Sequence, residues 1–152
     1  MDIDMFLTPD RVMLGLNAVS KADLLQHLAR CAAPAAGVVA SAIAAALTAR
    51  EQLGSTGLGR GFALPHARIV GVSRFVGLFA RLAAPVPFDA IDKAPVDLVF
   101  LLLIPGEASD GHLAALAAIS RRMRDERVAA GLRAVGSADD AYRMLAKAQP
   151  PE

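Results

Sequence analysis

The segment from Val96 to Ile104 restricts the fold of this chain more than any other. Eight of its nine residues are apolar, and Asp97 is the exception. A strand with apolar side chains at nearly every position is buried on both faces of its sheet, because successive side chains point to opposite sides. The sequence therefore predicts a central strand that is covered on both faces.

Helical spacing of apolar residues begins after Ser20, which can cap a helix through Asp23 three positions later. We expect Pro34 and Gly37 to end that helix. The 19 residues from Cys31 to Ala49 carry no charge and imitate a membrane span. Alanine makes up much of this stretch and transfers only weakly into hydrocarbon, so we interpret it as one helix end, a turn and a second helix.

Short strands and helices alternate along the remaining sequence. The four glycines between Gly54 and Gly61 indicate a loop. Pro85 and Pro87 are expected to break the strand before them. Strands are expected at 12–16 and 75–82, a short extended segment at 62–64, and helices at 38–53, 110–124, 128–133 and after residue 137.

Several strands follow one another with only short turns between them, so their order is too irregular for a doubly wound nucleotide-binding fold. We predict an α/β layered sandwich, with a mixed parallel and antiparallel sheet and helices packed on its faces. The length of 152 residues fits a single domain spanning residues 1–152.

Composition excludes several functional classes. With 16 basic and 15 acidic side chains, and neither half of the chain strongly charged, the sequence indicates no nucleic-acid partner. The single cysteine, Cys31, permits no internal disulfide. The first residues are acidic where a secretory signal would be basic, and we expect a cytoplasmic protein without membrane insertion.

The 37 residues from Gln52 to Phe88 contain no Asp or Glu. Average usage in this chain would place about four acids there, from 15 in 152. The same window holds Arg60, Arg68 and His66, and an anionic ligand or partner is favoured. A half-buried stretch of sheet would leave the same composition, and this alternative stays open.

The glycine-rich loop does not match the common nucleotide motifs. A P-loop requires Lys and Ser or Thr where Arg60 and Gly61 stand, and a dinucleotide fingerprint requires glycine where Phe62 stands. Both motifs also need a strand before the loop and a helix after it, which is the reverse of the order expected here. Ser55 lacks the two flanking glycines of a hydrolase elbow.

The string from Arg50 to His66, REQLGSTGLGRGFALPH, resembles the active-site signature of the fructose, mannitol and nitrogen-regulatory type of enzyme IIA in the phosphoenolpyruvate-dependent phosphotransferase system. The resemblance continues through PFDAID at 87–92 and PVDLVF at 95–100 and resumes at His112-Leu113. It extends over most of the chain and is closest to the stand-alone nitrogen-regulatory branch.

The resemblance implies that His66 accepts a phosphoryl group from a histidine-containing phosphocarrier protein. Neutral imidazole suits this role because its reference pKa, about 6.5, leaves a free lone pair near neutral pH. The other ring nitrogen should donate to a fixed acceptor, such as a backbone carbonyl. The family also has a second histidine at the place of His112, where it can orient the ring or bind the phosphate. A plain residue of the first helical turn is the alternative for His112.

Phosphate-binding groups are expected beside this ring, because phosphoryl transfer depends on positioning and on stabilising charge at the phosphate oxygens. Arg50 can offer a planar fork, the hydroxyls of Ser55 and Thr56 can donate, and Gly57 with the other loop glycines can bring backbone amides close. Arg50 could instead be a helix-end cation, and the two hydroxyls could serve only the turn. The family requires no metal or other cofactor for this chemistry.

Two residues depart from the family pattern. Ala67 follows the histidine where glycine is common, and Arg60 takes a place often held by a small or polar residue, which leaves the loop geometry in doubt. Arg60 and Arg68 could steer an anionic partner or be solvated. We expect His27 to be solvated, Cys31 to be a packing residue, and the arginines at 121, 122, 124 and 127 to form a solvated helix face.

Three functions are compatible with these residues. The first is a phosphorylated regulator of nitrogen or other metabolism, whose two forms would bind targets such as potassium-transport regulators or sensor kinases. The second is a soluble sugar-specific subunit that passes phosphate to a separate permease. The third is a binding module of the same fold that is never phosphorylated, against which the intact histidine and loop argue.

Overall fold

The computed structural model describes residues 1–107 and 111–146. Six strands form one sheet in the order β1-β5-β6-β3-β2, and β4 also pairs with β6. The strands are β1 Val12–Leu16, β2 Gly57–Gly59, β3 Phe62–Ala63, β4 His66–Ile69, β5 Val76–Val86 and β6 Val96–Pro105. Strand β6 runs antiparallel to β5 and parallel to β3 and β4, so the sheet is mixed as predicted.

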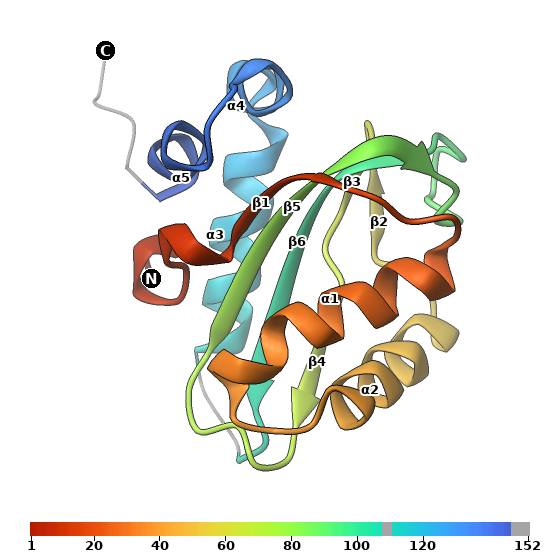
Figure 1. The fold of residues 1–152 in the computed structure, drawn as a ribbon, viewed down its shortest axis with the longest axis vertical. Coiled ribbons are helices and arrows are strands. Elements are labelled where there is room, and N and C mark those ends of the chain that lie inside the picture. Colours follow the sequence, from red (N-terminus) through yellow and green to blue (C-terminus); the bar gives the residue numbers. More distant parts are fainter. Residues whose placement is uncertain (108–110, 147–152) are drawn as a thin grey trace.

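Helices cover both faces of this sheet, with one group on each side (Figure 1). Two short 3-10 turns, at Ile3–Met5 and Pro9–Arg11, precede β1. The helices are α1 Lys21–Ala36, α2 Ala40–Gln52, α3 His112–Arg124, α4 Glu126–Ala134 and α5 Ala138–Ala146. The predicted layered sandwich is confirmed, and β6 is its central, doubly covered strand.

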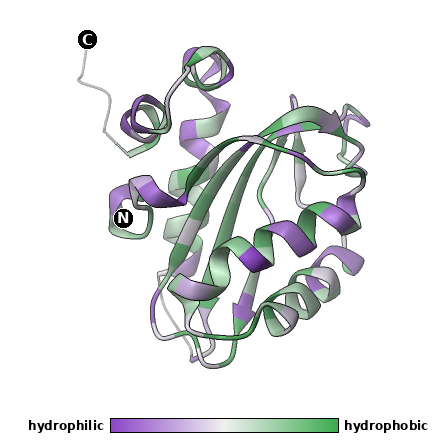
Figure 2. Cartoon of the chain, in the orientation of Figure 1, coloured by the Kyte–Doolittle hydropathy of each residue, from purple (hydrophilic) through white to green (hydrophobic). Residues whose placement is uncertain are grey.

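Alternate residues of β6 divide the core into two clusters. Val99, Leu101 and Leu103 pack with the apolar residues of α1 and α2. Leu98 and Leu102, by contrast, pack with α3, α4 and α5. All of these side chains are fully buried, and the strands form the apolar centre of the molecule in Figure 2. The apolar run therefore acts as predicted, supplying a layer of core to each side.

Helix α1 begins as predicted, because Ser20 Oγ accepts the Asp23 amide at 3.0 Å. The helix continues through Pro34, however, and ends only at Gly37, whose φ of 71° is left-handed. The prediction that Pro34 helps to end the helix is wrong: a proline so near the end disturbs little of the helical ladder. None of the helices within residues 1–107 and 111–146 combines the length and the apolar composition that a membrane span requires.

Two further strand predictions need correction. Residues 54–61 are not all loop, because Gly57–Gly59 pairs with β3 across a tight turn at Arg60 and Gly61, both with positive φ. Such a pair of φ angles is typical of a two-residue hairpin turn. Strand β5 also runs past Pro85 to Val86. Its pairing with β1 ends at Leu82, so the missing amide of Pro85 breaks no bond to that neighbour.

Candidate phosphoryl-acceptor site

His66 is the first residue of β4, a strand that sequence analysis did not predict, and it pairs with Leu102 of β6. Its ring is half-buried, and Nδ1 lies 2.8 Å from the carbonyl oxygen of Leu64. A carbonyl oxygen can only accept, so Nδ1 carries the proton and Nε2 keeps its lone pair. The backbone acceptor expected from the sequence is therefore present, and it is Leu64.

The surroundings of His66 keep its ring neutral. Burial lowers the pKa of His66 below its ordinary value, because removing water disfavours the charged form. The positive field of Arg50 and the nearby His112 lower the pKa further, whereas the Leu64 carbonyl and the Glu51 carboxylate raise it. The structure thus brings Arg50 and His112, both predicted site residues, within electrostatic reach of His66.

The loop before His66 is anchored by a buried carboxylate that sequence analysis did not single out. Glu51, at the end of α2, accepts the amide of Thr56 at 3.0 and 3.1 Å and also its hydroxyl. Lys21 Nζ lies 2.9 Å from the same carboxylate. The Thr56 carbonyl in turn accepts the amide of Leu64 at 3.0 Å. A chain of polar contacts therefore leads from Lys21 to the residue that orients His66.

Lys21 also ties this network to the segment after β5. Its ammonium group lies 4.6 Å from the centre of the Phe88 ring and 3.4 Å from the Phe88 carbonyl oxygen. Ser55 Oγ donates to the same carbonyl at 2.7 Å. Only tertiary structure brings these segments together. The sequence did hold a signal for this network. Glu51 is an acidic residue at the start of the glycine-rich signature, immediately after Arg50, which was expected to bind phosphate.

The predicted amide and hydroxyl donors of the loop are engaged within the protein. Thr56 donates to Glu51 from both its amide and its hydroxyl, Ser55 donates to Phe88, and the Gly57 amide donates to Ser55 Oγ at 3.0 Å. The Gly54 amide donates to the Glu51 carbonyl at 3.1 Å. In this conformation these groups shape the loop, and phosphate binding by Ser55, Thr56 and Gly57 stays a prediction.

Gly57 has a packing reason of its own. A Cβ atom built at this position would lie 2.8 Å from Ala90 Cβ and 2.9 Å from Ala90 Cα, closer than real Cβ contacts. The absence of a side chain lets the loop lie directly against the 88–92 segment. Gly57 thus serves close approach between two segments of this chain.

Arg50 and His112 frame the site from two helices. Arg50 stands in the last turn of α2, where Nη1 donates to the Gly54 carbonyl at 3.0 Å. This bond uses one of its five donors and directs the guanidinium toward the loop. His112 is the first residue of α3, as predicted for the first helical turn. Residue 110, where the sequence predicted this helix to begin, lies outside the described residues.

The acid-free stretch of sequence is not acid-free in space. Arg60 Nη1 lies 3.2 Å from Glu126 Oε1 of α4, and the Arg60 amide donates to Asp92 at 2.8 Å. Arg81 donates to carbonyls at the end of α4, including that of Val135 at 2.6 Å. These arginines therefore serve contacts within the protein. Arg68 occupies an exposed position of β4, where it pairs with Ile104 of β6.

Neither departure from the family pattern disturbs the site. Ala67 is buried strand backbone without a positive φ, so a methyl group is tolerated there. Arg60 adopts a left-handed φ of 58° at the hairpin turn, far along the loop from His66. Contacts with Asp92, Glu126 and Arg133 hold it there.

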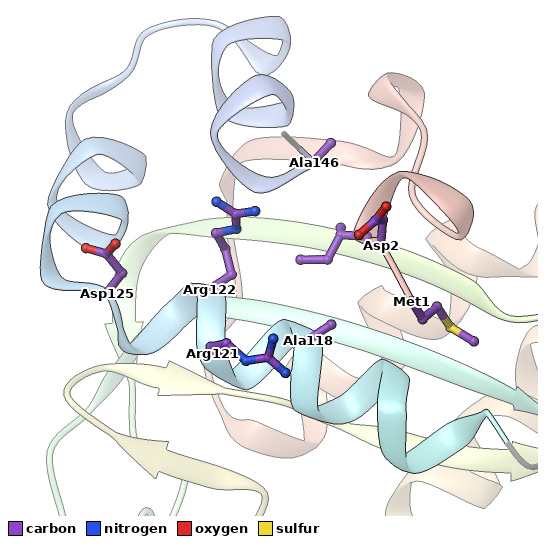
Figure 3. Close-up of a pocket in the computed structure, with 8 residues that line it drawn as sticks. Met1, Asp2, Ala118, Arg121, Arg122, Asp125 and Ala146 are labelled. Atoms are coloured by element: carbon purple, nitrogen blue, oxygen red, sulfur yellow. The ribbon is translucent and has the colours of Figure 1, made fainter. Parts of the chain in front are cut away.

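The remaining candidates lie away from this centre. Cys31 is partly buried against the core on α1, and burial raises the pKa of its thiol. His27 lies 3.4 Å from Asp23 on the same helix. Arg121 and Arg122 line a separate cleft of about 320 Å³ between α3 and the N-terminal residues, with Asp125 beside them (Figure 3). Within residues 1–107 and 111–146, no three His, Cys, Asp or Glu side chains are grouped so as to hold a metal ion.

Comparisons with known proteins show which family this chain resembles over its length. The family described as "Phosphoenolpyruvate-dependent sugar phosphotransferase system, EIIA 2" matches residues 5–148. A nitrogen regulatory protein of Bradyrhizobium diazoefficiens is 42% identical over 146 residues, which is 96% of this chain and 95% of that protein. A fructose-specific EIIA component of Haloferax volcanii is 41% identical over 83 residues, 55% of this chain and 54% of that protein.

Among solved structures, the nitrogen regulatory protein IIA-Ntr of Neisseria meningitidis superimposes with a TM-score of 0.90 at 34% identity. The superposition covers 94% of this chain and 98% of that one. The family match also extends over nearly the whole length of the chain. The chain belongs to the type 2 enzyme IIA family, whose members are phosphotransfer components of the phosphoenolpyruvate-dependent sugar phosphotransferase system.

Proposed function

We propose that this protein is a phosphoryl carrier that accepts phosphate on Nε2 of His66 and acts as a nitrogen or metabolic regulator. The observation that carries the proposal is the bond from Nδ1 of His66 to the Leu64 carbonyl, which leaves Nε2 as the nucleophile. A lowered pKa keeps that nitrogen unprotonated at neutral pH.

The donor would be the phosphohistidine of a histidine-containing phosphocarrier protein. The lone pair of Nε2 forms the new P–N bond while the donor's P–N bond breaks, and the donor nitrogen keeps the electron pair. Arg50 and His112, whose positive fields reach His66, would stabilise the phosphoryl oxygens as charge shifts between the two rings. Ser55, Thr56 and Gly57 hold the loop and thereby the ring.

Similarity to proteins named as nitrogen regulators supports the regulatory destination. Addition of about two negative charges to one ring can exchange protein partners. We propose regulatory proteins as those partners, of the kind that control potassium transport or sense signals through a kinase. A sugar-specific role is the second candidate, favoured by the similarity to a fructose-specific component.

Phosphorylation from radiolabelled phosphoenolpyruvate, with purified enzyme I and the histidine-containing phosphocarrier, tests the carrier function. We expect acid-labile label on the wild type and none on His66→Ala. Equal labelling of the two would contradict the assignment, and an unlabelled wild type would indicate a passive binding module.

A second incubation separates the two destinations. The labelled protein is mixed with fructose-type and mannitol-type enzyme IIB domains and their sugars. Retention of the label supports the regulatory role, and its rapid loss to a IIB domain supports the sugar-specific role.

A further inference from the structure

A cavity of about 410 Å³ lies near the opposite end of α3 from His112. Its floor is apolar and buried, formed by Phe62, Leu98 and Met123, which are 5%, 0% and 5% exposed. Its rim is charged, with Arg60, Arg124 and Glu126 around the opening. The volume is within the range of small-molecule sites, which combine apolar walls with a few placed polar groups.

The charges on the rim favour an anion. Arg133 also borders the cavity, but its guanidinium is bound to both oxygens of Asp97, at 2.8 and 2.9 Å. Arg60 is bound to Asp92 and Arg133 through its backbone, whereas its guanidinium pairs with Glu126 at the surface, where the two side chains are 74% and 84% exposed. Exposed pairs of this kind contribute at most about 1 kcal/mol, so a ligand can take over the guanidinium. Within the described part of the chain, Arg124 forms no ion pair.

The wall of this cavity is continuous with the site of His66. The hairpin β2–β3 begins at Gly57, next to Thr56, and ends at Ala63, next to Leu64. Phe62 pairs with Leu98, and His66 pairs with Leu102 on the same strand. Paired residues of parallel strands share a face of the sheet, and Leu98 and Leu102 lie on the same face of β6. The side chains of Phe62 and His66 therefore lie on one face, four residues or about 13 Å apart along the strand direction.

We propose that this cavity binds a small organic anion, with an aromatic or branched apolar body and a carboxylate or phosphate group. Its body would lie on the apolar floor, and its charge would pair with Arg60 and Arg124. The hairpin would transmit occupancy to the Leu64 carbonyl that orients His66, so the bound anion changes the rate of phosphorylation. The binding site is independent of the proposed function, and only this effect on rate rests on it.

Two matched dyes serve as probes of this cavity. 8-Anilinonaphthalene-1-sulfonate carries an aromatic body with an anionic group, and N-phenyl-1-naphthylamine is the uncharged counterpart. We expect one sulfonate dye per chain by fluorescence titration, binding at least about fivefold more tightly than the uncharged dye and weakening with added salt. Amide shifts in NMR spectra should centre on residues 58–62 and 123–130.

Substitutions at the rim distinguish the cavity from an ordinary apolar patch. Arg124→Gln should weaken binding of the sulfonate dye about fivefold, and Glu126→Gln should strengthen it by removing a competing anion. Ala130→Trp, at an exposed position of the wall, should abolish binding by filling the opening. Arg143→Gln on α5, whose side chain is 62% exposed, is the control and should change nothing.

Equal binding of the two dyes, unchanged affinity in Ala130→Trp, or amide shifts centred elsewhere would overturn the binding site. Phosphorylation is then compared with and without saturating dye, and a rate changed at least about twofold in the wild type but not in Ala130→Trp supports the coupling. An unchanged rate would overturn the coupling alone. If the wild type took up no label even without dye, the proposed function would be contradicted. The dye titration would still test the cavity as a binding site.

Discussion

Lys21 Nζ lies 2.9 Å from Glu51 Oε1, and this pair joins the start of α1 to the end of α2. The side chains are 20% and 5% exposed, so the pair is largely removed from water. The same carboxylate holds Thr56, whose carbonyl binds the residue that orients His66. The geometry of the proposed acceptor therefore depends on an ion pair between two residues that do not themselves contact the ring.

Glu51→Gln should lower the free energy of unfolding by about 3 kcal/mol. The substitution removes the buried anion of Lys21, leaving it the exposed Asp89 carboxylate at 3.9 Å, and weakens the acceptor of the Thr56 amide and hydroxyl. Denaturant titration of the two proteins measures the difference. Glu126→Gln, which removes an exposed pair with Arg60, is the matched control and should cost less than about 1 kcal/mol. Equal effects of the two substitutions would show that the Glu51 pair is not special.

His112→Ala should slow phosphorylation but leave residual labelling. His112 influences His66 through the electric field and stands at the helix start beside it, yet Nε2 of His66 remains the nucleophile. Initial rates of labelling measure the loss. His27→Ala removes a histidine of α1 that pairs with Asp23, and it should label at the wild-type rate. Full indifference to His112→Ala would make that residue structural.

Substitution of Arg50 should separate charge from shape. Arg50→Gln should slow labelling by about 100-fold, the usual effect of losing one donor to developing negative charge. Arg50→Lys keeps the charge without the planar fork and should fall between Gln and the wild type. Comparable denaturation midpoints in the three proteins would assign the loss to chemistry. Identical labelling rates would leave the contact with Gly54 as the role of Arg50.

The lowered pKa of His66 predicts a pH dependence with a definite sign. As pH falls, the unfolded chain is protonated first, near the ordinary value of 6.5, and the folded ring only at lower pH. The neutral ring therefore stabilises the fold fully above 6.5, and this contribution is lost as pH falls through the folded pKa. NMR titration should give the His66 ring a pKa below 6.5. The ring signal is identified by its absence from the spectrum of His66→Gln.

Denaturation of the same two proteins checks this sign independently. Stability of the wild type should fall more steeply than that of His66→Gln as the solution is made acidic from neutrality. A ring pKa at or above 6.5, or parallel stability curves, would show that burial does not dominate at His66.

Gly57→Ala should destabilise the protein by roughly 1–3 kcal/mol, because the methyl group would meet the backbone of Ala90. Rigid backbone cannot move away as the end of a flexible side chain could. Gly136→Ala, where a Cβ would meet nothing within 4 Å, is the control and should be close to neutral. If Gly57→Ala were as stable as the wild type, the loop at Gly57 and the 88–92 segment would separate easily.

Local patterns predicted the parts of the molecule that local chemistry determines. The apolar run of β6, the Ser20 cap and the helical spacing of α1 act within a few residues, so they could be read directly. Strand β4 was not predicted, although its residues alternate polar and apolar and the apolar ones are buried. An alternation of only four residues directly after a proline is too short to indicate a strand by itself. They become a strand only by pairing with β6, 36 positions further along the chain at Leu102.

By itself, the sequence predicted the layered α/β architecture, and its resemblance to a family predicted that His66, Arg50 and His112 lie near one another. Residues 50–66 carry most of that resemblance as one continuous string, and His112 enters only because the resemblance resumes there. Only the tertiary structure decided what holds the site: Lys21 against Glu51, the Leu64 carbonyl against Nδ1, and loop donors turned inward. The pair of Lys21 and Glu51 joins segments distant in sequence, and it determines which partners the nearby loop donors have. Buried polar groups must find partners inside the protein, and no local pattern specifies which partners the fold supplies.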